Sequence, residues 1–304
     1  YGKGLNGFDY KKNIVLNAGN SGTFARLILG LLVKSPYYIK LIGDKSLSRR
    51  DFERVISPLQ KVGVNFKVNN KKTLPLKIIG SSFVNPIHYF ENRGSAQCKS
   101  TMMLAALSSP GQTVIRAKKS RDHTENIFKY LGIPIIVKRY KHNDEIKVKG
   151  QKSFKSFKYK VPSDPSSCAF FIVLTLLSKN CELRIKDVNV NKSRIGYIEI
   201  LNKMGAKIKI KNTKKRYGEK QADIFVKSQS TLKKINCPPN LNSNLIDEFL
   251  IIFLAAAKAN GVSSFSNLGE LNKKESPRLK LGSKLLNQLG IKTKLTKNSI
   301  KIFG

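Results

Sequence analysis

The chain repeats one pattern four times, and this repeat restricts its possible folds more than any other feature. In each copy a helix-forming segment ends near a glycine, and a short alternating strand follows it. The four junctions are Val62-Gly63-Val64, Leu131-Gly132-Ile133, Met204-Gly205-Ala206 and Leu289-Gly290-Ile291. Glycine directly after the last helical turn is a common way to end a helix. A period of about 70 to 85 residues is too long for a simple solenoid and indicates a larger repeated unit.

A second, more apolar helix is expected upstream of each of these glycines, once in every copy. Its apolar spacing places it at residues 24–32, 99–107, 167–177 and 247–257. Each unit therefore has a strand, an apolar helix, a strand, an amphipathic helix and a closing pair of strands. We expect such units to pack around a shared centre with the apolar helices inside. Because 304 residues suffice for two domains, the sequence predicts an α/β fold in two domains.

The expected apolar helices all begin on small or polar residues. The four starts are Asn20-Ser21-Gly22-Thr23, Gly94-Ser95-Ala96-Gln97, Asp164-Pro165-Ser166-Ser167 and Asn244-Leu245-Ile246-Asp247. Helix capping explains each start taken alone. Several helix N-termini with little side-chain bulk also form a surface suited to phosphate and carboxylate groups. Both interpretations stay open at this point.

The net charge of +38 raises the possibility of a nucleic-acid partner. Most of the basic residues, however, are lysines spread over loops and solvent faces. A single-strand binder needs clustered arginines and exposed aromatic side chains on one face, and the sequence has no such cluster. We therefore expect no nucleic-acid function, and an enzyme that handles anions. Four arginines fall in the segments discussed here, and guanidinium groups bind carboxylates and phosphates in bidentate fashion: Arg26, Arg50, Arg121 and Arg278.

The remaining composition argues against metals and membranes. The four cysteines (Cys98, Cys168, Cys181 and Cys237) and three histidines (His88, His123 and His142) show no metal-binding spacing. We expect reduced thiols, no metal site and a cytoplasmic location. The longest apolar runs are too short to span a bilayer. Since the chain starts at Tyr1 and ends just after an expected strand at 299–303, we interpret it as an internal fragment.

Eight segments, in order along the chain, resemble motifs of the 5-enolpyruvylshikimate-3-phosphate (EPSP) synthase family. They are GNSGTFARL (19–27), GDKSLSRR (43–50), GSAQCKS (94–100), SRDHTE (120–125), VPSDPSSCAFF (161–171), NKSR (191–194), IDEF (246–249) and KES (274–276). The SAQxK and RxHxE forms are similar to the branch often called class II. The resemblance implies a two-domain enolpyruvyl transferase fold of repeated βαβαββ units, an inside-out α/β barrel with its active site in the interdomain cleft. Residues 1–160 would form the N-terminal lobe and 161–304 the C-terminal lobe, both incomplete.

The resemblance also implies the reaction. The enolpyruvyl group of phosphoenolpyruvate would pass to the 5-hydroxyl of 3-phosphoshikimate and phosphate would leave, in the shikimate pathway to chorismate and the aromatic amino acids. The family uses no metal and no organic cofactor, and a monomer is expected. The two substrates carry several negative charges, so the site requires cationic side chains and helix N-termini.

The family's functional residues carry over onto matching positions of this chain. Those implied for phosphoenolpyruvate are Asn20, Gly22, Thr23, Arg50, Gln97 and Arg278. Those implied for 3-phosphoshikimate are Ser95, Ala96, Gln97, Arg121, Asp247 and Lys274. Asp247 would remove the proton of the 5-hydroxyl, and Glu275 would assist proton transfer at the methylene carbon. The non-catalytic alternatives are an ordinary helix cap for Asp247, a pair with Asp51 for Arg50, and solvent exposure for Lys274 and Glu275.

The chain departs from the family pattern at several positions. Pro277 stands where the family has an aspartate that would orient Arg278, and Asp51 stands where a proline follows Arg50. Basic substrate ligands near both ends of the family sequence have no counterpart in residues 1–304, so we expect weak activity from this stretch alone.

Two other functions stay open from the sequence. The first is the sister enolpyruvyl transfer to UDP-N-acetylglucosamine, which uses a reactive cysteine on a mobile loop. Cys98 is expected in a helix instead, and the SAQ and RDHTE segments favour 3-phosphoshikimate. The second is a non-catalytic, basic nucleic-acid-binding relative, a possibility raised by Pro277 and Asp51.

Overall fold

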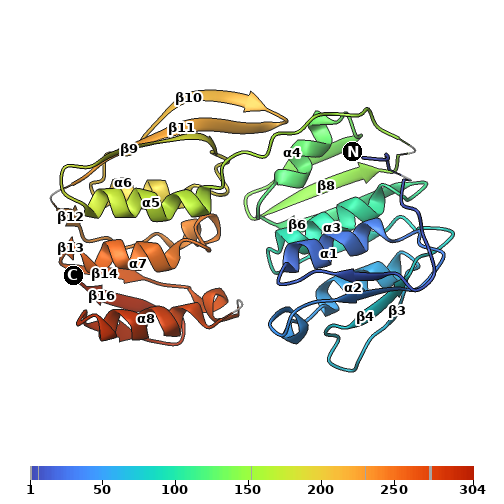
Figure 1. The fold of residues 1–304 in the computed structure, drawn as a ribbon, viewed down its shortest axis with the longest axis horizontal. Coiled ribbons are helices and arrows are strands. Elements are labelled where there is room, and N and C mark those ends of the chain that lie inside the picture. Colours follow the sequence, from blue (N-terminus) through green and yellow to red (C-terminus); the bar gives the residue numbers. More distant parts are fainter. Residues whose placement is uncertain (1, 6, 152, 230, 274–275) are drawn as a thin grey trace. The chain divides into compact units, whose positions relative to one another are not determined.

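The computed structural model describes residues 2–5, 7–151, 153–229, 231–273 and 276–304. The chain divides into two compact units, residues 1–158 and 159–304. The division lies within two residues of the boundary expected at 160/161. Each unit has its own hydrophobic core, and each holds two copies of the repeat (Figure 1).

The first copy contains a four-stranded sheet and two helices. Its elements are β1 (Val15–Asn17), α1 (Gly22–Leu31), β2 (Ile39–Ile42), the 3-10 turn η1 (Leu47–Arg49), α2 (Glu53–Lys61), β3 (Asn65–Lys67) and β4 (Leu76–Ile79). The strand order is β1-β2-β4-β3. Strands β1 and β2 are parallel because α1 crosses between them, whereas the β2–β4 and β3–β4 pairs are antiparallel.

The second copy has the same plan. Its elements are β5 (His88–Glu91), α3 (Ala96–Ala106), β6 (Gln112–Lys118), α4 (His123–Tyr130), β7 (Ile135–Arg139) and β8 (Asn143–Lys149). The strand order β5-β6-β8-β7 repeats that of the first sheet, again with one parallel and two antiparallel pairs. The predicted order of six elements is confirmed in unit 1.

Unit 2 contains two modified copies. The third copy has α5 (Pro165–Leu177), β9 (Glu182–Asn189), α6 (Gly196–Lys203), β10 (Lys209–Arg216) and β11 (Glu219–Lys227). Its first strand is reduced to one parallel bridge between Ser163 and Val188. The fourth copy has β12 (Leu232–Lys233), η2 (Pro239–Asn244), α7 (Phe249–Ala257), β13 (Ala259–Asn260), β14 (Val262–Phe265), η3 (Gly269–Lys273), α8 (Arg278–Gln288), β15 (Thr293–Leu295) and β16 (Ile300–Phe303). The pair β12–β13 is parallel, and the closing sheet has the order β14-β16-β15.

The four repeated glycines end their helices as predicted. Their φ angles are positive: 102° at Gly63, 70° at Gly132, 95° at Gly205 and 78° at Gly290. In each copy the next residue donates its backbone N–H to a carbonyl in the last helical turn: Val64 to Leu59, Ile133 to Phe128, Ala206 to Leu201 and Ile291 to Leu286. This is the hydrogen bond of a left-handed glycine cap, and it turns the chain directly into the next strand.

Helices α1 and α3 pack closely in unit 1, side by side (Figure 1). The contact depends on Gly30, because a Cβ atom there would lie 2.3 Å from the carbonyl oxygen of Thr101. The hydroxyl of Thr101 donates to the carbonyl of Arg26 at 3.0 Å. Nearer the helix starts, Gln97 reaches Thr23 at 2.8 Å, so the two helices run in the same direction with their N-termini close together.

The apolar helices differ from the expectation in two respects. Helix α7 begins at Phe249, two residues later than expected, because Leu245 to Glu248 form a turn in which the Glu248 N–H bonds to the Leu245 carbonyl. Helix α5 is also buried on one side alone: its Cys168, Ile172 and Leu176 side chains lie in the core, whereas those of Phe170, Phe171 and Leu174 are more than half exposed. Among the described residues, no helix combines the length and the apolar character needed to cross a membrane.

Replacing Gly30 should show how strongly the α1–α3 contact is constrained. We expect Gly30→Ala to lower the unfolding free energy by about 1 to 3 kcal/mol, the usual cost of overpacking. The added methyl group would meet backbone, which cannot rotate away as a side chain can. Chemical denaturation of the variant and of the parent protein measures the difference. An unchanged or raised stability would contradict the packing argument, because alanine is otherwise favoured over glycine in a helix.

Unit 2 should lose stability in acid through Asp223 on β11. Hydrogen bonds from the side chains of Asn212 and Arg184 lower the pKa of Asp223 from 3.8 to about 2. Because the folded pKa is below the unfolded one, this stabilisation is complete above the ordinary value and is lost as the pH falls from 3.8 towards 2. We expect the unfolding free energy of Asp223→Asn to depend less steeply on pH in this window than that of the parent. Parallel slopes in denaturation curves would contradict this assignment.

Candidate functional site

The start of α1 is a capped helix N-terminus. The Asn17 side chain accepts the Gly19 N–H at 2.9 Å, and Gly19 has the positive φ of 52° that this turn requires. The Ser21 hydroxyl accepts the Phe24 N–H at 3.1 Å and is the N-cap. The capping interpretation is therefore correct for this helix. It leaves Gly22 and Thr23 as the first two helical residues.

Two guanidinium groups lie against Gly22. A Cβ atom at Gly22 would be 2.8 Å from Nη1 of Arg26 and 2.9 Å from Nη1 of Arg50. Gly22 is buried and helical, and its φ is not in the left-handed region. The glycine is therefore not required by its backbone angle. Instead, the ends of two cationic side chains occupy the space that a side chain at position 22 would fill.

Gln97 connects the starts of α3 and α1. Its Nε2 donates to the Thr23 hydroxyl at 2.8 Å, and its Oε1 accepts from Nη1 of Arg26 at 2.9 Å. Arg26 also lies over the Phe52 ring at 5.1 Å. Its partial burial lowers the pKa of the guanidinium, an effect of desolvation that nearby Arg50 reinforces. Gly22, Thr23, Arg50 and Gln97 thus gather in one place.

Arg26 belongs to this cluster although the sequence did not assign it a role. The signal was present, because Arg26 follows Gly22 by four residues and so projects from the same helical face. Its contact with Gln97 depends on the α1–α3 packing, which no local pattern shows.

Asn20 has a different role from its neighbours. Its side-chain amide donates to the Asp44 carboxylate, and the Asp44 N–H bonds to the Gly19 carbonyl at 2.8 Å. The backbone N–H of Leu47 and the Asn20 amide, in that order, lower the pKa of Asp44. Asn20 therefore fastens the loop before α1 to the loop that carries Arg50.

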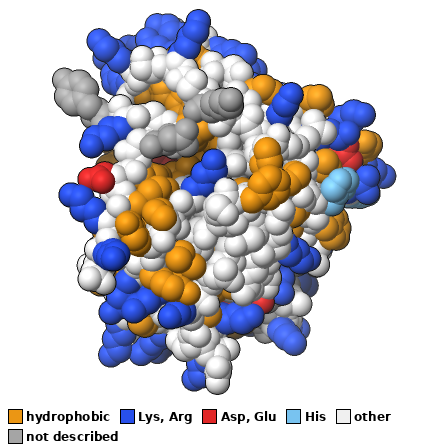
Figure 2. Space-filling view, turned by 90° about the vertical axis from the view of Figure 1, so that its right-hand side faces the viewer, with side chains coloured by type: hydrophobic (Ala, Val, Ile, Leu, Met, Phe, Trp, Pro, Cys, Tyr) orange, Lys and Arg blue, Asp and Glu red, His pale blue; other side chains and the backbone are white. Residues whose placement is uncertain are grey.

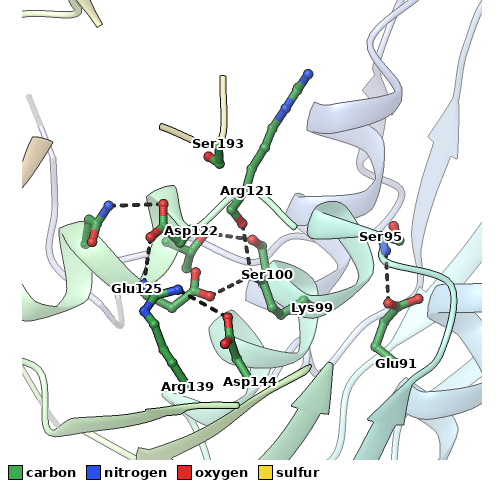
Figure 3. A network of polar contacts seen from close by, with 12 residues as sticks. Glu91, Ser95, Lys99, Ser100, Arg121, Asp122, Glu125, Arg139, Asp144 and Ser193 are labelled. Carbon is green, nitrogen blue, oxygen red and sulfur yellow. Dashed lines mark hydrogen bonds and ion pairs between the residues drawn. The ribbon is translucent and has the colours of Figure 1, made fainter. Parts of the chain in front are cut away.

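Ser95, Ala96 and Arg121 lie near the start of α3 and the loop before α4. Ser95 is the N-cap of α3, and its Oγ accepts the Cys98 N–H at 3.3 Å. Its hydroxyl hydrogen can still be donated to a ligand. Ala96 is the first residue of the helix. The backbone carbonyl of Arg121 accepts a hydrogen bond from Nζ of Lys99 at 2.9 Å (Figure 3).

In unit 2, Asp247 and Arg278 form an ion pair. Nη1 of Arg278 lies 3.0 Å from Oδ1 of Asp247. The N-cap position of α7 is Glu248, so Asp247 is not the ordinary helix cap that we considered. Pro277 does not leave Arg278 without a carboxylate either, because Asp247 supplies one. Lys274 and Glu275 lie outside the described residues.

Asp164 is the N-cap of α5, which confirms the capping role expected for the start of this helix. Its carboxylate accepts the N–H and the hydroxyl of Ser167 at 2.8 and 2.9 Å and pairs with Arg194 at 2.9 Å. Burial raises the pKa of Asp164, but the bonds from Ser167 and Arg194 outweigh it, so the pKa is lowered.

Positive charge is dispersed on the surface, and three of the four cysteines are buried: Cys98, Cys168 and Cys237. On the face drawn in Figure 2, Lys and Arg are scattered between hydrophobic side chains rather than gathered in one stripe. Within the described ranges, no three His, Cys, Asp or Glu side chains are grouped as a metal site requires. Burial raises the pKa of Cys98, and it raises that of Cys168 and Cys237 to about 11.

Known proteins match this chain along its whole length. Residues 2–304 match the family described as EPSP synthase (3-phosphoshikimate 1-carboxyvinyltransferase). A 3-phosphoshikimate 1-carboxyvinyltransferase of Ruthia magnifica is 42% identical, with 100% of this chain and 68% of the relative covered. One from Thermodesulfovibrio yellowstonii is 37% identical, with 100% and 70% covered.

Solved structures agree in fold. An EPSP synthase from Acinetobacter baumannii has a TM-score of 0.86 and 35% identity, with 99% of this chain and 67% of that chain covered. The enolpyruvyl transferase NikO from Streptomyces tendae has a TM-score of 0.67 at 14% identity, with 91% and 62% covered, which shows a shared fold alone. The two-domain enolpyruvyl transferase fold expected from the sequence is thus confirmed, and the chain belongs to the EPSP synthase family.

Proposed function

We propose that this chain acts as a 3-phosphoshikimate 1-carboxyvinyltransferase. It transfers the enolpyruvyl group of phosphoenolpyruvate to the 5-hydroxyl of 3-phosphoshikimate and releases phosphate. The observation that carries this proposal is the cluster of Gly22, Thr23, Arg26, Arg50 and Gln97 at the starts of α1 and α3. Such a cluster suits a small, highly charged anion, because it combines two guanidinium groups with the N-termini of two helices.

Phosphoenolpyruvate binds against Gly22 in this proposal. Arg50 holds its carboxylate or phosphate, and Gln97 and Thr23 contribute neutral hydrogen bonds. Asn20 acts indirectly, because its hydrogen bond to Asp44 holds the loop that carries Arg50. Arg26 orients Gln97 and adds positive charge, which offsets the charge of the donor without a covalent role.

The acceptor binds at the start of α3. Ser95, Ala96 and Gln97 present hydroxyl, backbone and amide donors to 3-phosphoshikimate, and Arg121 binds its phosphate side. Lys274, assigned from the resemblance alone, binds the shikimate part.

The reaction is an addition followed by an elimination. Asp247 takes the proton of the 5-hydroxyl, and the hydroxyl oxygen attacks C2 of phosphoenolpyruvate. At the same time a proton adds to the methylene carbon with help from Glu275. The tetrahedral ketal phosphate then loses phosphate and a methyl proton, which restores the double bond. Arg278 binds Asp247 in the structure. When the donor carboxylate takes Arg278, this ion pair is broken and Asp247 acts as the base.

The chemistry consists of proton transfers and one exchange of leaving group, so no metal or organic cofactor is included in the proposal. The enzyme acts as a cytoplasmic monomer, without membrane or nucleic-acid partners. Sedimentation of the purified protein tests the monomer, and unchanged turnover with a chelator tests the metal-free reaction.

The test of function is release of phosphate from phosphoenolpyruvate that depends on 3-phosphoshikimate. Transfer to UDP-N-acetylglucosamine instead would favour the sister reaction. Binding of oligonucleotides at physiological salt, without any turnover, would favour the non-catalytic alternative.

Gly22→Ala should selectively weaken the binding of the donor, phosphoenolpyruvate. The new methyl group would displace the ends of Arg26 and Arg50, so we expect the KM for phosphoenolpyruvate to rise about tenfold. The KM for 3-phosphoshikimate should change much less. Stability should change by less than about 1 kcal/mol, because the displaced groups are flexible and alanine favours the helix. Steady-state kinetics with both substrates and a melting curve measure these effects.

Gly30→Ala in the same helix is the comparison for stability. It adds the same methyl group and helix propensity, but the methyl group meets backbone of α3, so it should lower the melting temperature more than Gly22→Ala does. Equal losses for both substrates and a lowered melting temperature in Gly22→Ala would overturn the proposed donor position.

Asp247→Ala should lower kcat by two or more orders of magnitude, the usual contribution of a general base. Asp247→Asn separates this role from the pairing role, since an amide oxygen can still accept a bond from Arg278 but is a very poor base. We expect both variants to lose turnover and to keep most of their affinity for 3-phosphoshikimate. Rate measurements at saturating substrate decide, and near-normal turnover in Asp247→Asn would exclude Asp247 as the base.

A further inference from the structure

A buried ion pair joins the start of α3 to the start of α4. Nζ of Lys99 lies 2.6 Å from Oε1 of Glu125, and each side chain is 1% exposed. Lys99 also donates to the backbone carbonyl of Arg121 at 2.9 Å. Neither charged group belongs to the proposed reaction, although both lie directly beside residues assigned to the acceptor (Figure 3).

Stability is a poor explanation for this pair. Removing two charges from water is costly, and apolar residues of similar volume often serve a protein core as well or better. What an apolar pair cannot do is hold the carbonyl of Arg121. The hydrogen bond from Lys99 to the Arg121 carbonyl therefore explains the buried pair better than a contribution to stability does.

The pair connects the two segments that bind the acceptor in the proposed function. Lys99 lies two residues after Gln97, in the first turns of α3. Glu125 lies in the first turn of α4 and so follows the loop that carries Arg121. One side chain thus fixes the start of α3 and the backbone of Arg121 relative to each other.

Neighbouring contacts hold the same two segments from their other sides. Arg139 on β7 pairs with Asp122 at 2.8 Å and with Asp144 at 3.2 Å, which fixes the residue after Arg121. The buried carboxylate of Glu91 accepts the Ser95 N–H at 2.9 Å. Figure 3 shows the side chain of Arg121 leaving this network and pointing away from Glu125.

We propose that Lys99 and Glu125 are positioning residues for 3-phosphoshikimate. They set the separation between the Ser95-Ala96-Gln97 turn and Arg121, and hence the fit of the acceptor, without touching it. This inference rests on the proposed function. It gives both residues an effect on acceptor binding that exceeds their effect on the donor.

The test replaces the pair by a neutral one in the enzyme. In the double variant Lys99→Met with Glu125→Met the core keeps its volume, but the carbonyl of Arg121 loses its donor. We expect the Kd for 3-phosphoshikimate, measured by calorimetry, to rise on the order of tenfold. The KM for phosphoenolpyruvate at saturating acceptor, and kcat, should stay within about twofold.

The double variant Lys99→Gln with Glu125→Gln covers the case in which the methionine variant does not fold. A glutamine at 99 can bond to a glutamine at 125 but is one atom shorter than lysine, so it cannot serve the Arg121 carbonyl as well. The same selective loss of acceptor affinity is expected.

Ser100→Ala is the matched control. It removes another bond between the two helices, the one between the Ser100 and Thr124 hydroxyls at 2.7 Å, without affecting the donor of the Arg121 carbonyl. Its Kd for 3-phosphoshikimate should equal that of the parent. Equal weakening in Ser100→Ala, or an unchanged Kd in the folded double variants, would overturn the inference.

The same measurements separate this inference from the proposed function. If the parent enzyme bound 3-phosphoshikimate but did not turn it over, the proposed function would fail, and the Kd comparison would still decide the role of the pair. If the parent did not bind 3-phosphoshikimate at all, the inference would be overturned as well.

Discussion

The close approach of α1 and α3 is the constraint on which the rest of unit 1 depends. Gly30 permits it, because any side chain there would collide with the Thr101 carbonyl. Only with the helices this close can Gln97 reach both Thr23 and Arg26. Two helix N-termini are thereby combined into one region of positive potential, although each alone would be an ordinary capped end. The candidate donor site is thus a product of helix packing.

The sequence predicted the architecture well because the repeat depends on local signals. A glycine that ends a helix and an alternating strand after it are visible in short windows, and the four glycine caps share one hydrogen-bond pattern. The sequence placed the start of α7 too early because aspartate is a common N-cap residue and Asp247 precedes the apolar run. In the structure the chain makes one more turn before the helix begins. Exposure of α5 was missed because apolar composition shows what can be buried, but not which face is covered.

Candidate residues were harder to predict than the fold because their roles depend on distant partners. Arg26 and Gln97 are 71 residues apart in sequence and meet at 2.9 Å. Asp247 and Arg278 are 31 residues apart and form a pair that replaces the orienting carboxylate lost at Pro277. Motif resemblance named most of these positions but could not show the pairings. The buried pair of Lys99 and Glu125 has the same character, since its significance appears only through the Arg121 carbonyl.

The contact between Arg26 and Gln97 also determines the direction of the glutamine amide. A guanidinium group can only donate hydrogen bonds, so the carbonyl end of Gln97 must face Arg26 and its NH2 end must face away. One N–H of that group is used by Thr23, and the second can be satisfied only by an acceptor. The second N–H of the Gln97 amide therefore favours ligands that present oxygen lone pairs. A glutamate at this position would keep the bond to Arg26, but an acceptor oxygen would replace the NH2 donor. The amide at position 97 therefore selects ligands that accept hydrogen bonds.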